Sequence, residues 1–225
     1  MAGHTHFAES IEEYLEAVYR LEVEGSGVTT SGVASELGVS PASVSGMLKK
    51  LASDGYLEHR ARGDAKLTQK GRELGARVVR RHRLAERLLV DVLGMPWDEV
   101  QNEACILEHA ISERVEAHLI KILGNPTTCP HGHPIPALDG SQPARTDVPL
   151  AQLPVGARST VAGVTEEVPE ILRYLADVGL RPGVSVEVTD KAPLGGPVTV
   201  RIGNRPHAIS LELARMVTVA PLPAA

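Results

Sequence analysis

Hydrophobic positions in the first third of the chain recur with the period of an α-helix. In "ESIEEYLEAVYRLEV" (9–23) apolar residues return every three or four positions, which predicts a helix that two glycines end. A second, short helix is predicted over 29–39, and Gly38 ends it. In the stretch that follows, "SPASVSGMLKKLASDGY", Ser40 is placed to cap a third helix whose first position is Pro41. Two short helices joined by a glycine turn are typical of a helix-turn-helix.

The next segment, "YLEHRARGDAKLTQKGRE" (56–73), contains two short strand-like pieces around the turn "RGD". A β-hairpin that follows a helix-turn-helix is typical of the wing of a winged helix. We predict a winged helix here because three independent local signals, the first helix, the helix-turn-helix and the hairpin, occur in that order. A long helix is then predicted from about Thr68 to Leu93. A further helix follows Trp97, and Ser112 caps one more that ends near Leu123.

The last third of the chain changes to short segments that alternate apolar and polar residues. Residues 124–158 are rich in Pro and Gly and predict an ordered exit segment followed by a linker. Beyond them, "RSTVAGVT", "VSVEVTD", "PVTVRIG", "HAISLE" and "MVTVAPL" predict strands, and "EEVPEILRYLADVGL" predicts one helix. Five short strands in so short a stretch indicate a small SH3-like β-barrel.

The predicted fold is therefore mainly α with a β module. The predicted divisions are a winged-helix domain over 1–75, a helical domain over 76–142, a linker over 143–155 and an SH3-like domain over 156–225. A chain of 225 residues is long enough for two or three such domains.

Composition adds an expected location. Only six of the residues are aromatic, so the cores must be built from aliphatic side chains. No apolar run approaches the length that spans a bilayer, and the N-terminus lacks the regions of a signal peptide, so we expect a soluble, cytoplasmic protein without a membrane partner. In that setting Cys105 and Cys129 are interpreted as thiols or metal ligands in preference to a disulfide.

Charge is distributed unevenly along the chain. Residues 28–87 hold twelve Lys and Arg against six Asp and Glu, a net charge of +6, so the remainder carries −11 within the total of −5. A basic module on an acidic body is expected where one region meets phosphates and another binds cations or partners.

The basic module predicts a DNA-binding surface. Recognition helices enter the major groove by their N-terminal residues, where hydroxyl groups and cations reach phosphates and base edges. Because Gly46 stands where a long base-reading side chain would fit, readout of DNA shape is expected to outweigh direct base contacts. The alternative is a winged helix that binds protein and has a solvated basic face. The candidate DNA-binding residues are Ser40, Pro41, Ala42, Ser43, Ser45, Gly46, Lys49 and Lys50 on the helix, and Arg60, Arg62 and Lys66 in the wing.

A second kind of chemistry is indicated by "NEACILEH" (102–109). On a helix Cys105, Glu108 and His109 stand at i, i+3 and i+4, which is one face. Taken alone, this motif is better explained by a core helix with one buried cysteine and a surface Glu-His pair.

Two other predicted helices carry ligand-type residues at the same spacing. His82 and Glu86 are four residues apart, and Glu13 and Glu16 are three apart. A set of oxygen, nitrogen and sulfur donors suits Fe²⁺ or Mn²⁺. The segment "CPHGH" adds Cys129, His131 and His133, which would complete a second site.

Five stretches together resemble the diphtheria-toxin-repressor family of metal-dependent transcriptional repressors, in both its iron-responsive and its manganese-responsive branches. They are "SIEEYLEAVYRLE", "SPASVSGMLKKLASDGYL", "RRHRLAERLLVDVLG", "NEACILEHAISERVEAHLIKIL" and "GHPIPALDG". The resemblance covers the first 140 residues closely, and the C-terminal β region is similar to the SH3-like domain of the longer members.

The resemblance implies a primary metal site formed by Glu13, Cys105, Glu108 and His109, with Glu16 nearby. Iron-type members carry Met at the position of Glu13, so the carboxylate here is similar to the manganese branch, whereas Cys105 is similar to the iron branch. The metal thus stays open between Mn²⁺ and Fe²⁺, and other divalent transition metals are expected to substitute in vitro.

The resemblance also implies an ancillary site, and hence two sites per subunit. Its ligands map to His82, Glu86, Gln101, Glu167 and Glu170. Gln101 replaces the His of iron-type members. Some relatives use instead a C-x-H exit motif, which matches Cys129 and His131 together with Glu86, so both ligand sets stay open. Glu167 and Glu170 would otherwise belong to a solvated acidic turn.

The function that the resemblance implies is repression of metal-homeostasis genes by a cytoplasmic homodimer, with no catalytic activity. The dimer is expected to bind a palindromic double-stranded operator only when it holds metal, because the ligands connect the first helix to the dimerisation helices. Two alternatives remain: a metalloenzyme in which Cys105 and His109 act as nucleophile and base, and a winged-helix regulator that senses an organic ligand without metal. The operator sequence and the number of dimers on it stay open.

Overall fold

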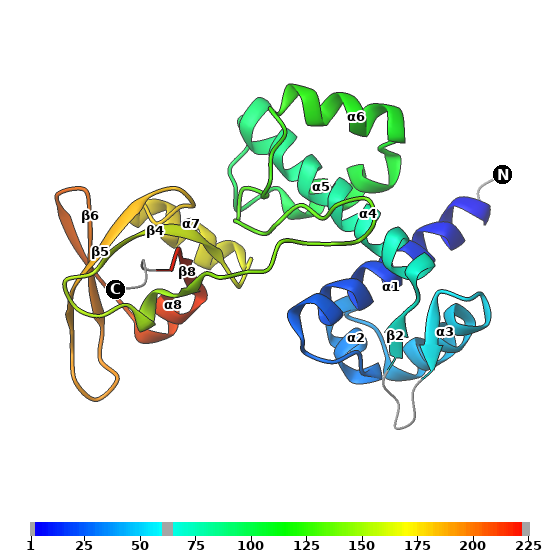
Figure 1. Ribbon diagram of the computed structural model, residues 1–225, viewed down its shortest axis with the longest axis horizontal. Coiled ribbons are helices and arrows are strands. Elements are labelled where there is room, and N and C mark those ends of the chain that lie inside the picture. The colour runs from blue at the N-terminus through cyan, green and yellow to red at the C-terminus, as the bar shows by residue number, and fades with distance from the viewer. Residues whose placement is uncertain (1–2, 60–64, 222–225) are drawn as a thin grey trace. The chain divides into compact units, whose positions relative to one another are not determined.

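The structure is a computed structural model that describes residues 3–59 and 65–221, with side chains described over 11–58 and 65–221 (Figure 1). The chain forms two compact units. The first contains Met1–Ala85, Cys105–His118 and Ile135–Gln142, and the second contains Glu86–Ala104, Leu119–Pro134 and Pro143–Ala225.

The first unit begins with the predicted winged helix. Its elements are α1 (Gly3–Glu24), α2 (Thr30–Leu37), α3 (Pro41–Ser53), β1 (Leu57–His59), β2 (Ala65–Leu67) and the first part of α4 (Gln69–Arg87). In Figure 1, α2, α3 and β2 lie together beside α1. A single hydrophobic core, which includes Leu15, Val33, Leu51 and Leu67, holds these elements together.

The helix-turn-helix forms where its caps predict it. Gly38 ends α2 with a φ of 64°, a left-handed conformation that glycine adopts without strain. Ser40 then caps α3, since its hydroxyl accepts a hydrogen bond from the Ser43 N–H, and Pro41 takes the first helical position. The predicted winged helix-turn-helix is confirmed.

The wing is an antiparallel pair in which Leu57 lies opposite Leu67. Glu22 of α1 ties it to the helices, because one carboxylate oxygen accepts from the Leu67 N–H at 3.0 Å and the other pairs with Arg72 of α4. Arg60 and Arg62, predicted at the tip of the wing, lie outside the described residues.

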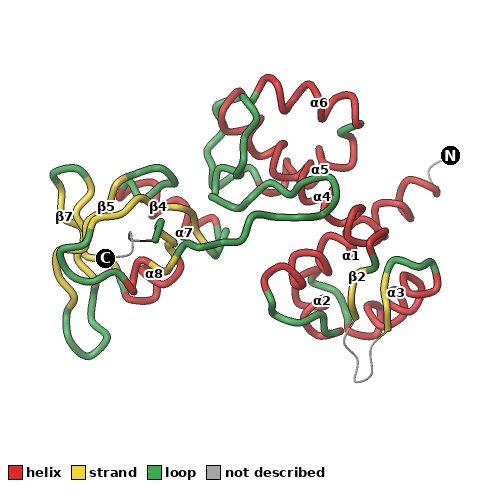
Figure 2. Tube along the Cα trace, in the orientation of Figure 1, coloured by secondary structure: helices red, strands yellow, loops and turns green. Residues whose placement is uncertain are grey.

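The second unit contains the predicted β module. Its sheet has the strand order β3-β8-β4-β5-β6-β7, with every neighbouring pair antiparallel. Figure 2 shows these strands together with α7 and α8. The elements are β3 (Val148–Pro149), η2 (Leu150–Gln152), β4 (Arg158–Val164), α7 (Pro169–Val178), β5 (Ser185–Lys191), β6 (Val198–Ile202), β7 (Arg205–Ile209), α8 (Leu211–Met216) and β8 (Val217–Val219).

Four helical elements lie between the wing and the six-stranded sheet along the chain. The long helix α4 passes into one π-helical turn, η1 (Leu88–Val92), and α5 (Gln101–Ala110) and α6 (Glu113–Ile122) follow. Ser112 accepts a hydrogen bond from the Val115 N–H and so caps α6 as predicted. Trp97, which lies before α5, is buried in the core of the second unit with Leu150, Leu172 and Leu175.

The structure corrects the prediction for the C-terminal region in two places. The predicted strand "HAISLE" ends at Ile209, because Ser210 caps the short helix α8 by accepting from the Leu213 N–H. The predicted linker contains β3, which pairs with β8 and brings the sheet to six strands. Among the described residues, no helix is both long and apolar enough to cross a membrane.

Candidate metal centres and DNA-binding surface

The first cluster of ligand-type side chains lies in the first unit, between α4 and α5. His82, Cys105 and Glu108 bring their ligand atoms within 4.8 Å of one another. The His82 Nδ1 atom lies 2.6 Å from Glu108 Oε2, and the Cys105 Sγ atom lies 4.0 Å from the same nitrogen. His82 and Glu108 are buried, whereas Cys105 is exposed, so the cluster opens to solvent at its thiol.

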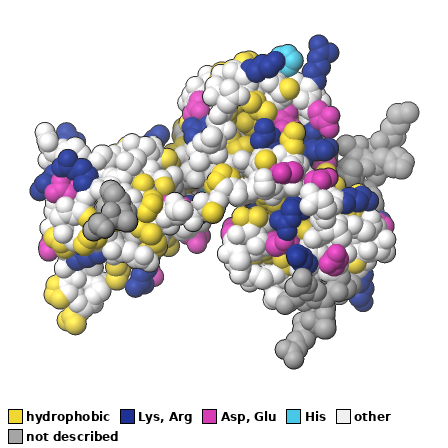
Figure 3. All heavy atoms as spheres, viewed as in Figure 1, with side chains coloured by type: hydrophobic (Ala, Val, Ile, Leu, Met, Phe, Trp, Pro, Cys, Tyr) yellow, Lys and Arg dark blue, Asp and Glu magenta, His cyan; other side chains and the backbone are white. Residues whose placement is uncertain are grey.

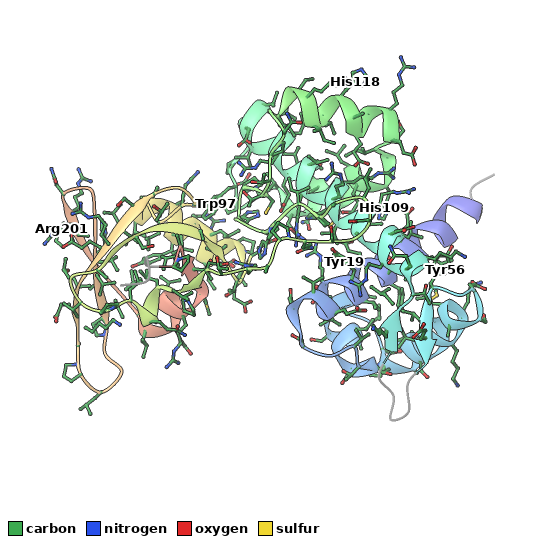
Figure 4. The ribbon with its side chains drawn as sticks, in the orientation of Figure 1. Tyr19, Tyr56, Trp97, His109, His118 and Arg201 are labelled. Carbon is green, nitrogen blue, oxygen red and sulfur yellow. The ribbon has the colours of Figure 1, made fainter. Side chains whose placement is uncertain are left out.

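His109 extends this cluster toward α1 (labelled in Figure 4). Its Nε2 atom lies 3.2 Å from Glu108 Oε1, and its Nδ1 atom lies 2.8 Å from Glu12 Oε2. The hydrogen bond with Glu12 raises the pKa of His109. A carboxylate on one ring nitrogen leaves the other nitrogen directed at Glu108, which is the arrangement of a metal-ligating histidine and its supporting acid.

The two acidic residues that were predicted as ligands on α1, Glu13 and Glu16, do not contact His109 as Glu12 does. Glu13 is exposed, and Glu16 pairs with Arg20 one turn along the helix, at 2.7 Å. Glu16 nevertheless acts on the cluster through its charge, since burial first and then the neighbouring charge of Glu16 raise the pKa of Glu108. The structure thus brings Glu12, which the sequence did not indicate, closer to His109 than either predicted carboxylate.

The second cluster lies in the second unit. Glu86 of α4, Cys129, His131 and Glu167 bring their ligand atoms within 4.8 Å of one another. The His131 Nδ1 atom lies 3.1 Å from Glu86 Oε1, 3.7 Å from Glu167 Oε1 and 4.0 Å from Cys129 Sγ. Three of the four residues are fully buried, and Glu167 is four-fifths buried.

The loop that carries Cys129 and His131 is held by its own backbone. The Cys129 N–H donates to the His133 carbonyl at 2.8 Å, and Arg87 donates to the carbonyls of Thr128 and Cys129. Gly132 has a φ of 95°, and a Cβ atom there would overlap the Ala162 carbonyl of β4. This close approach lets the His131 carbonyl accept from the Val164 N–H, which joins the loop to the sheet.

Charge is balanced in the second cluster by a proton. Burial by itself would lower the pKa of His131, but hydrogen bonds with Cys129 and Glu86 outweigh it and raise that pKa to about 11. For Glu167 burial acts in the opposite direction and by itself would raise the pKa. The hydrogen bond with His133 and the nearby histidine charges outweigh it and lower the pKa of Glu167 to about 2. Burial raises the pKa of the Cys129 thiol. A cationic imidazole therefore lies among carboxylates, where a metal ion would carry the same sign of charge.

Both clusters have donors that divalent transition metals accept. Each combines carboxylate oxygen, imidazole nitrogen and one sulfur, a set that suits Fe²⁺ and Mn²⁺ and also softer ions. The buried carboxylates of the second cluster need a positive partner, because an uncompensated buried charge is strongly destabilising.

The predicted ancillary residues divide between these two clusters. His82 and Glu86 are four residues apart on α4, and this one-turn offset directs His82 to Glu108 and Glu86 to the loop of His131. Glu170 is exposed in the first turn of α7, outside the second cluster, and Gln101 is the first residue of α5. The sequence did not indicate His133, which holds Glu167 at 2.9 Å.

The DNA-binding surface predicted on α3 is open to solvent. Nothing lies within 4 Å of a Cβ atom built at Gly46, so the middle of this face is shallow. Figure 3 shows Lys and Arg side chains in dark blue, mixed with Asp and Glu, on the visible face of this part of the chain. The exposed candidates are Ser40, Pro41, Ala42, Ser43, Gly46, Lys49 and Lys66, and Ser45 and Lys50 are half-buried.

A winged helix in the same chain as two clusters of metal-ligand side chains defines a DNA-binding regulator of the metal-responsive class. Three family matches agree with this class. Residues 6–65 match the iron dependent repressor N-terminal DNA binding domain, 68–137 match the iron dependent repressor metal binding and dimerisation domain, and 148–221 match the FeoA domain.

Relatives of known name match over nearly the whole chain. The iron-dependent repressor IdeR of Mycobacterium tuberculosis is 40% identical, over 94% of this chain and 96% of that protein. The diphtheria toxin repressor of Corynebacterium diphtheriae is 31% identical, over 95% of this chain and 98% of that protein. A solved structure of a manganese-dependent transcriptional repressor complex with manganese has a TM-score of 0.82 and is 33% identical, and the match covers 94% of this chain and 100% of that one.

The chain belongs to the diphtheria-toxin-repressor family of iron- and manganese-dependent transcriptional repressors. The predicted family and the predicted order of a helical DNA-binding domain, a helical dimerisation region and an SH3-like module are confirmed. The relatives are repressors and not enzymes, which favours the repressor over the metalloenzyme alternative.

Proposed function

We propose that the protein is a cytoplasmic homodimeric repressor that binds a palindromic operator when it holds Mn²⁺ or Fe²⁺, and that it controls metal-homeostasis genes. The observation that carries this proposal is the gathering of two ligand clusters in the chain that also carries the winged helix. The proposed domains are 1–75 for DNA binding, 76–142 for metal binding and dimerisation, and 156–225 as the SH3-like domain. The segment 143–155 joins the last two and contributes β3 and η2.

The proposed first site consists of His82, Cys105, Glu108 and His109, with Glu13 and Glu16 available from α1. Its three buried or half-buried ligands come from α4 and α5, and Glu12 reaches His109 from α1. When bound, a divalent ion supplies positive charge that allows these acidic side chains to lie together. The proposed ligands of this site therefore connect α1 of the winged-helix domain to α4 and α5.

The proposed second site consists of Glu86, Cys129, His131 and Glu167. Its ligands come from α4, the loop after α6 and the segment before α7, so it ties the helical part of the second unit to the sheet module. Metal binding must displace the proton on His131 Nδ1 and the proton of the Cys129 thiol, since both groups are protonated at neutral pH without metal.

A dimer surface is supported by apolar side chains that α5 and α6 leave in solvent. In the first unit, Ile106 of α5 is 68% exposed and Val115 of α6 is 47% exposed. Figure 3 shows hydrophobic side chains, in yellow, at the surface where these helices lie. We propose that these exposed aliphatic side chains belong to the dimer interface, where a second copy would cover them. Two copies would then present two α3 helices to successive major grooves of a palindrome.

Metal and operator must strengthen each other's binding by the same factor, because linkage between two sites is reciprocal. The proposal is tested by selection of duplexes from a random DNA pool, with full-length protein in Mn²⁺ and in chelator at one salt concentration. We expect a palindrome to be enriched only with Mn²⁺. In size-exclusion chromatography the protein should elute as a dimer or a multiple of a dimer. Equal enrichment in chelator would favour the metal-independent regulator.

A further inference from the structure

Trp97 is the only tryptophan in the chain, and it lies directly against the second cluster. It is 2% exposed and contributes no ligand atom. Its backbone carbonyl accepts a hydrogen bond from His131 Nε2 at 2.8 Å. A histidine that donates from Nε2 presents its Nδ1 atom as the ligand, and here Nδ1 is the atom that lies near Glu86, Glu167 and Cys129.

The indole ring restrains the same imidazole a second time. The two rings are stacked, with 5.4 Å between their centroids and 29° between their planes. Because His131 is buried, a rotation of its ring that exchanged Nδ1 and Nε2 would have to displace the indole and break the bond to the Trp97 carbonyl. Trp97 therefore fixes both the position of the His131 ring and which of its two nitrogens points toward the other ligands.

Trp97 is itself anchored to the module that supplies another ligand. Its Nε1–H donates to the Leu172 carbonyl of α7 at 3.1 Å, and the Arg181 guanidinium lies 5.1 Å from the indole centroid on the ring face. Glu167 precedes α7 by two residues. One side chain thus contacts the loop of His131 and the helix that follows Glu167, although the two ligands are 36 positions apart in the sequence.

We infer that Trp97 is the positioning residue of the second metal site, which orients His131 with Nδ1 toward the other ligands and joins it to α7. This inference rests on the proposed function of the second cluster. Supporting groups of this kind typically change metal affinity by about tenfold to a hundredfold when they are removed.

The test uses Co²⁺ as the probe, with full-length, chelator-stripped protein in which Cys105→Ser leaves Cys129 as the sole thiolate. The thiolate-to-cobalt charge-transfer band then reports the second cluster alone. In this background Trp97→Met, which fills the volume without a ring, is expected to weaken Co²⁺ binding about tenfold and to shift the ligand-field bands. Trp97→Phe, which restores a ring against His131, is expected to recover most of the affinity and the parent spectrum.

A second core variant separates positioning from general stability. Leu175→Ala removes a fully buried side chain of the same core, so it lowers the melting temperature and should leave the Co²⁺ spectrum unchanged. If Trp97→Met bound Co²⁺ with the parent affinity and spectrum, the inference would be overturned. If the Cys105→Ser background itself gave no thiolate band, the second metal site of the proposed function would fail, whatever Trp97 does.

An independent measurement needs no Trp97 variant. Long-range ¹H–¹⁵N NMR of the Zn²⁺-loaded protein shows which nitrogen of each histidine carries a proton. His131 is expected to be protonated at Nε2 and metal-bound at Nδ1. The opposite tautomer in a loaded site would overturn the inference even if Trp97→Met does not fold.

Discussion

The His82 Nδ1 atom lies 2.6 Å from Glu108 Oε2, and each side chain is only 2% exposed. Without His82, the buried Glu108 carboxylate keeps its desolvation cost and, among the described residues, has only His109, whose Nε2 atom lies 3.2 Å from Oε1, to offset it. His82→Ala should therefore lower the free energy of unfolding of the metal-free protein by about 3 kcal/mol at neutral pH. Urea unfolding in the presence of chelator measures this change.

The matched control is His118→Ala on α6. His118 is exposed and bonds only its own helix, to the Arg114 carbonyl at 2.7 Å, among the described contacts. That variant should change stability by no more than about 0.5 kcal/mol. Equal losses in the two variants would contradict the assignment of His82 and Glu108 as a buried pair.

The pH dependence of the metal-free protein should follow His131 and Glu167. The pKa of His131 is about 11 in the folded protein and about 6.5 in an unfolded chain, so its contribution is complete below about pH 6.5 and is lost as pH rises toward 11. The pKa of Glu167 is about 2 when folded and about 4.3 when unfolded, so its contribution is complete above about pH 4.3 and is lost as pH falls through 2. The free energy of unfolding should hence decline as pH is raised from about 6.5 to about 9.

Chemical unfolding in chelator at fixed ionic strength gives this profile. His131→Gln should remove most of the alkaline decline, because the variant has no proton to lose at that position. A decline of the same slope in His131→Gln would show that other groups cause it.

Glu12 and Glu13 are adjacent, and the structure distinguishes them sharply. Glu12 accepts a hydrogen bond from His109 and raises its pKa, whereas Glu13 is exposed and acts on His109 only through a weaker charge. Glu12→Gln should lower the pKa of His109 by more than Glu13→Gln does. Titration of the His109 ring protons by NMR in metal-free protein compares the two, and a larger shift in Glu13→Gln would contradict the contact.

The recognition helix should tolerate a larger residue at its one internal glycine. Nothing lies within 4 Å of a Cβ atom built at Gly46, so Gly46→Ala should raise the free energy of unfolding by about 1 kcal/mol through helix propensity. Gly71 of α4 is the matched control, because a Cβ atom there would overlap the Tyr56 carbonyl. Gly71→Ala should lower stability by about 2 kcal/mol. Thermal and urea unfolding of both variants test this contrast.

The winged helix could be predicted because its signals are local. Gly38 and Ser40 fix the ends of two helices, and the hairpin follows directly, so no distant contact decides these elements. The six-residue helix α8 could not be predicted, because "ISLELARM" satisfies strand alternation as well as one helical turn. The hydrogen bond at Ser210 decides between them.

Most candidate ligands were identifiable from spacing, whereas their grouping was not. Spacing places His82 and Glu86 on one side of a helix, but the partners that each one meets lie 26 and 45 positions further along the chain. Glu12 was missed because Glu13 is the family match and the two differ only in helical phase. Trp97 was missed as a functional residue because an apolar aromatic beside a helix is ordinarily read as core.

The measurement that tests the central claim most directly is fluorescence anisotropy of a labelled operator duplex at fixed salt and pH. Chelator-stripped protein is titrated anaerobically with Mn²⁺, Fe²⁺ and Zn²⁺, for the wild type and for Glu108→Gln, His131→Gln and His118→Ala. The account predicts tight binding only with metal in the wild type and in His118→Ala, and loss of most of the metal response in the other two. Equal affinity in chelator, or an unchanged metal response in both cluster variants, would contradict it.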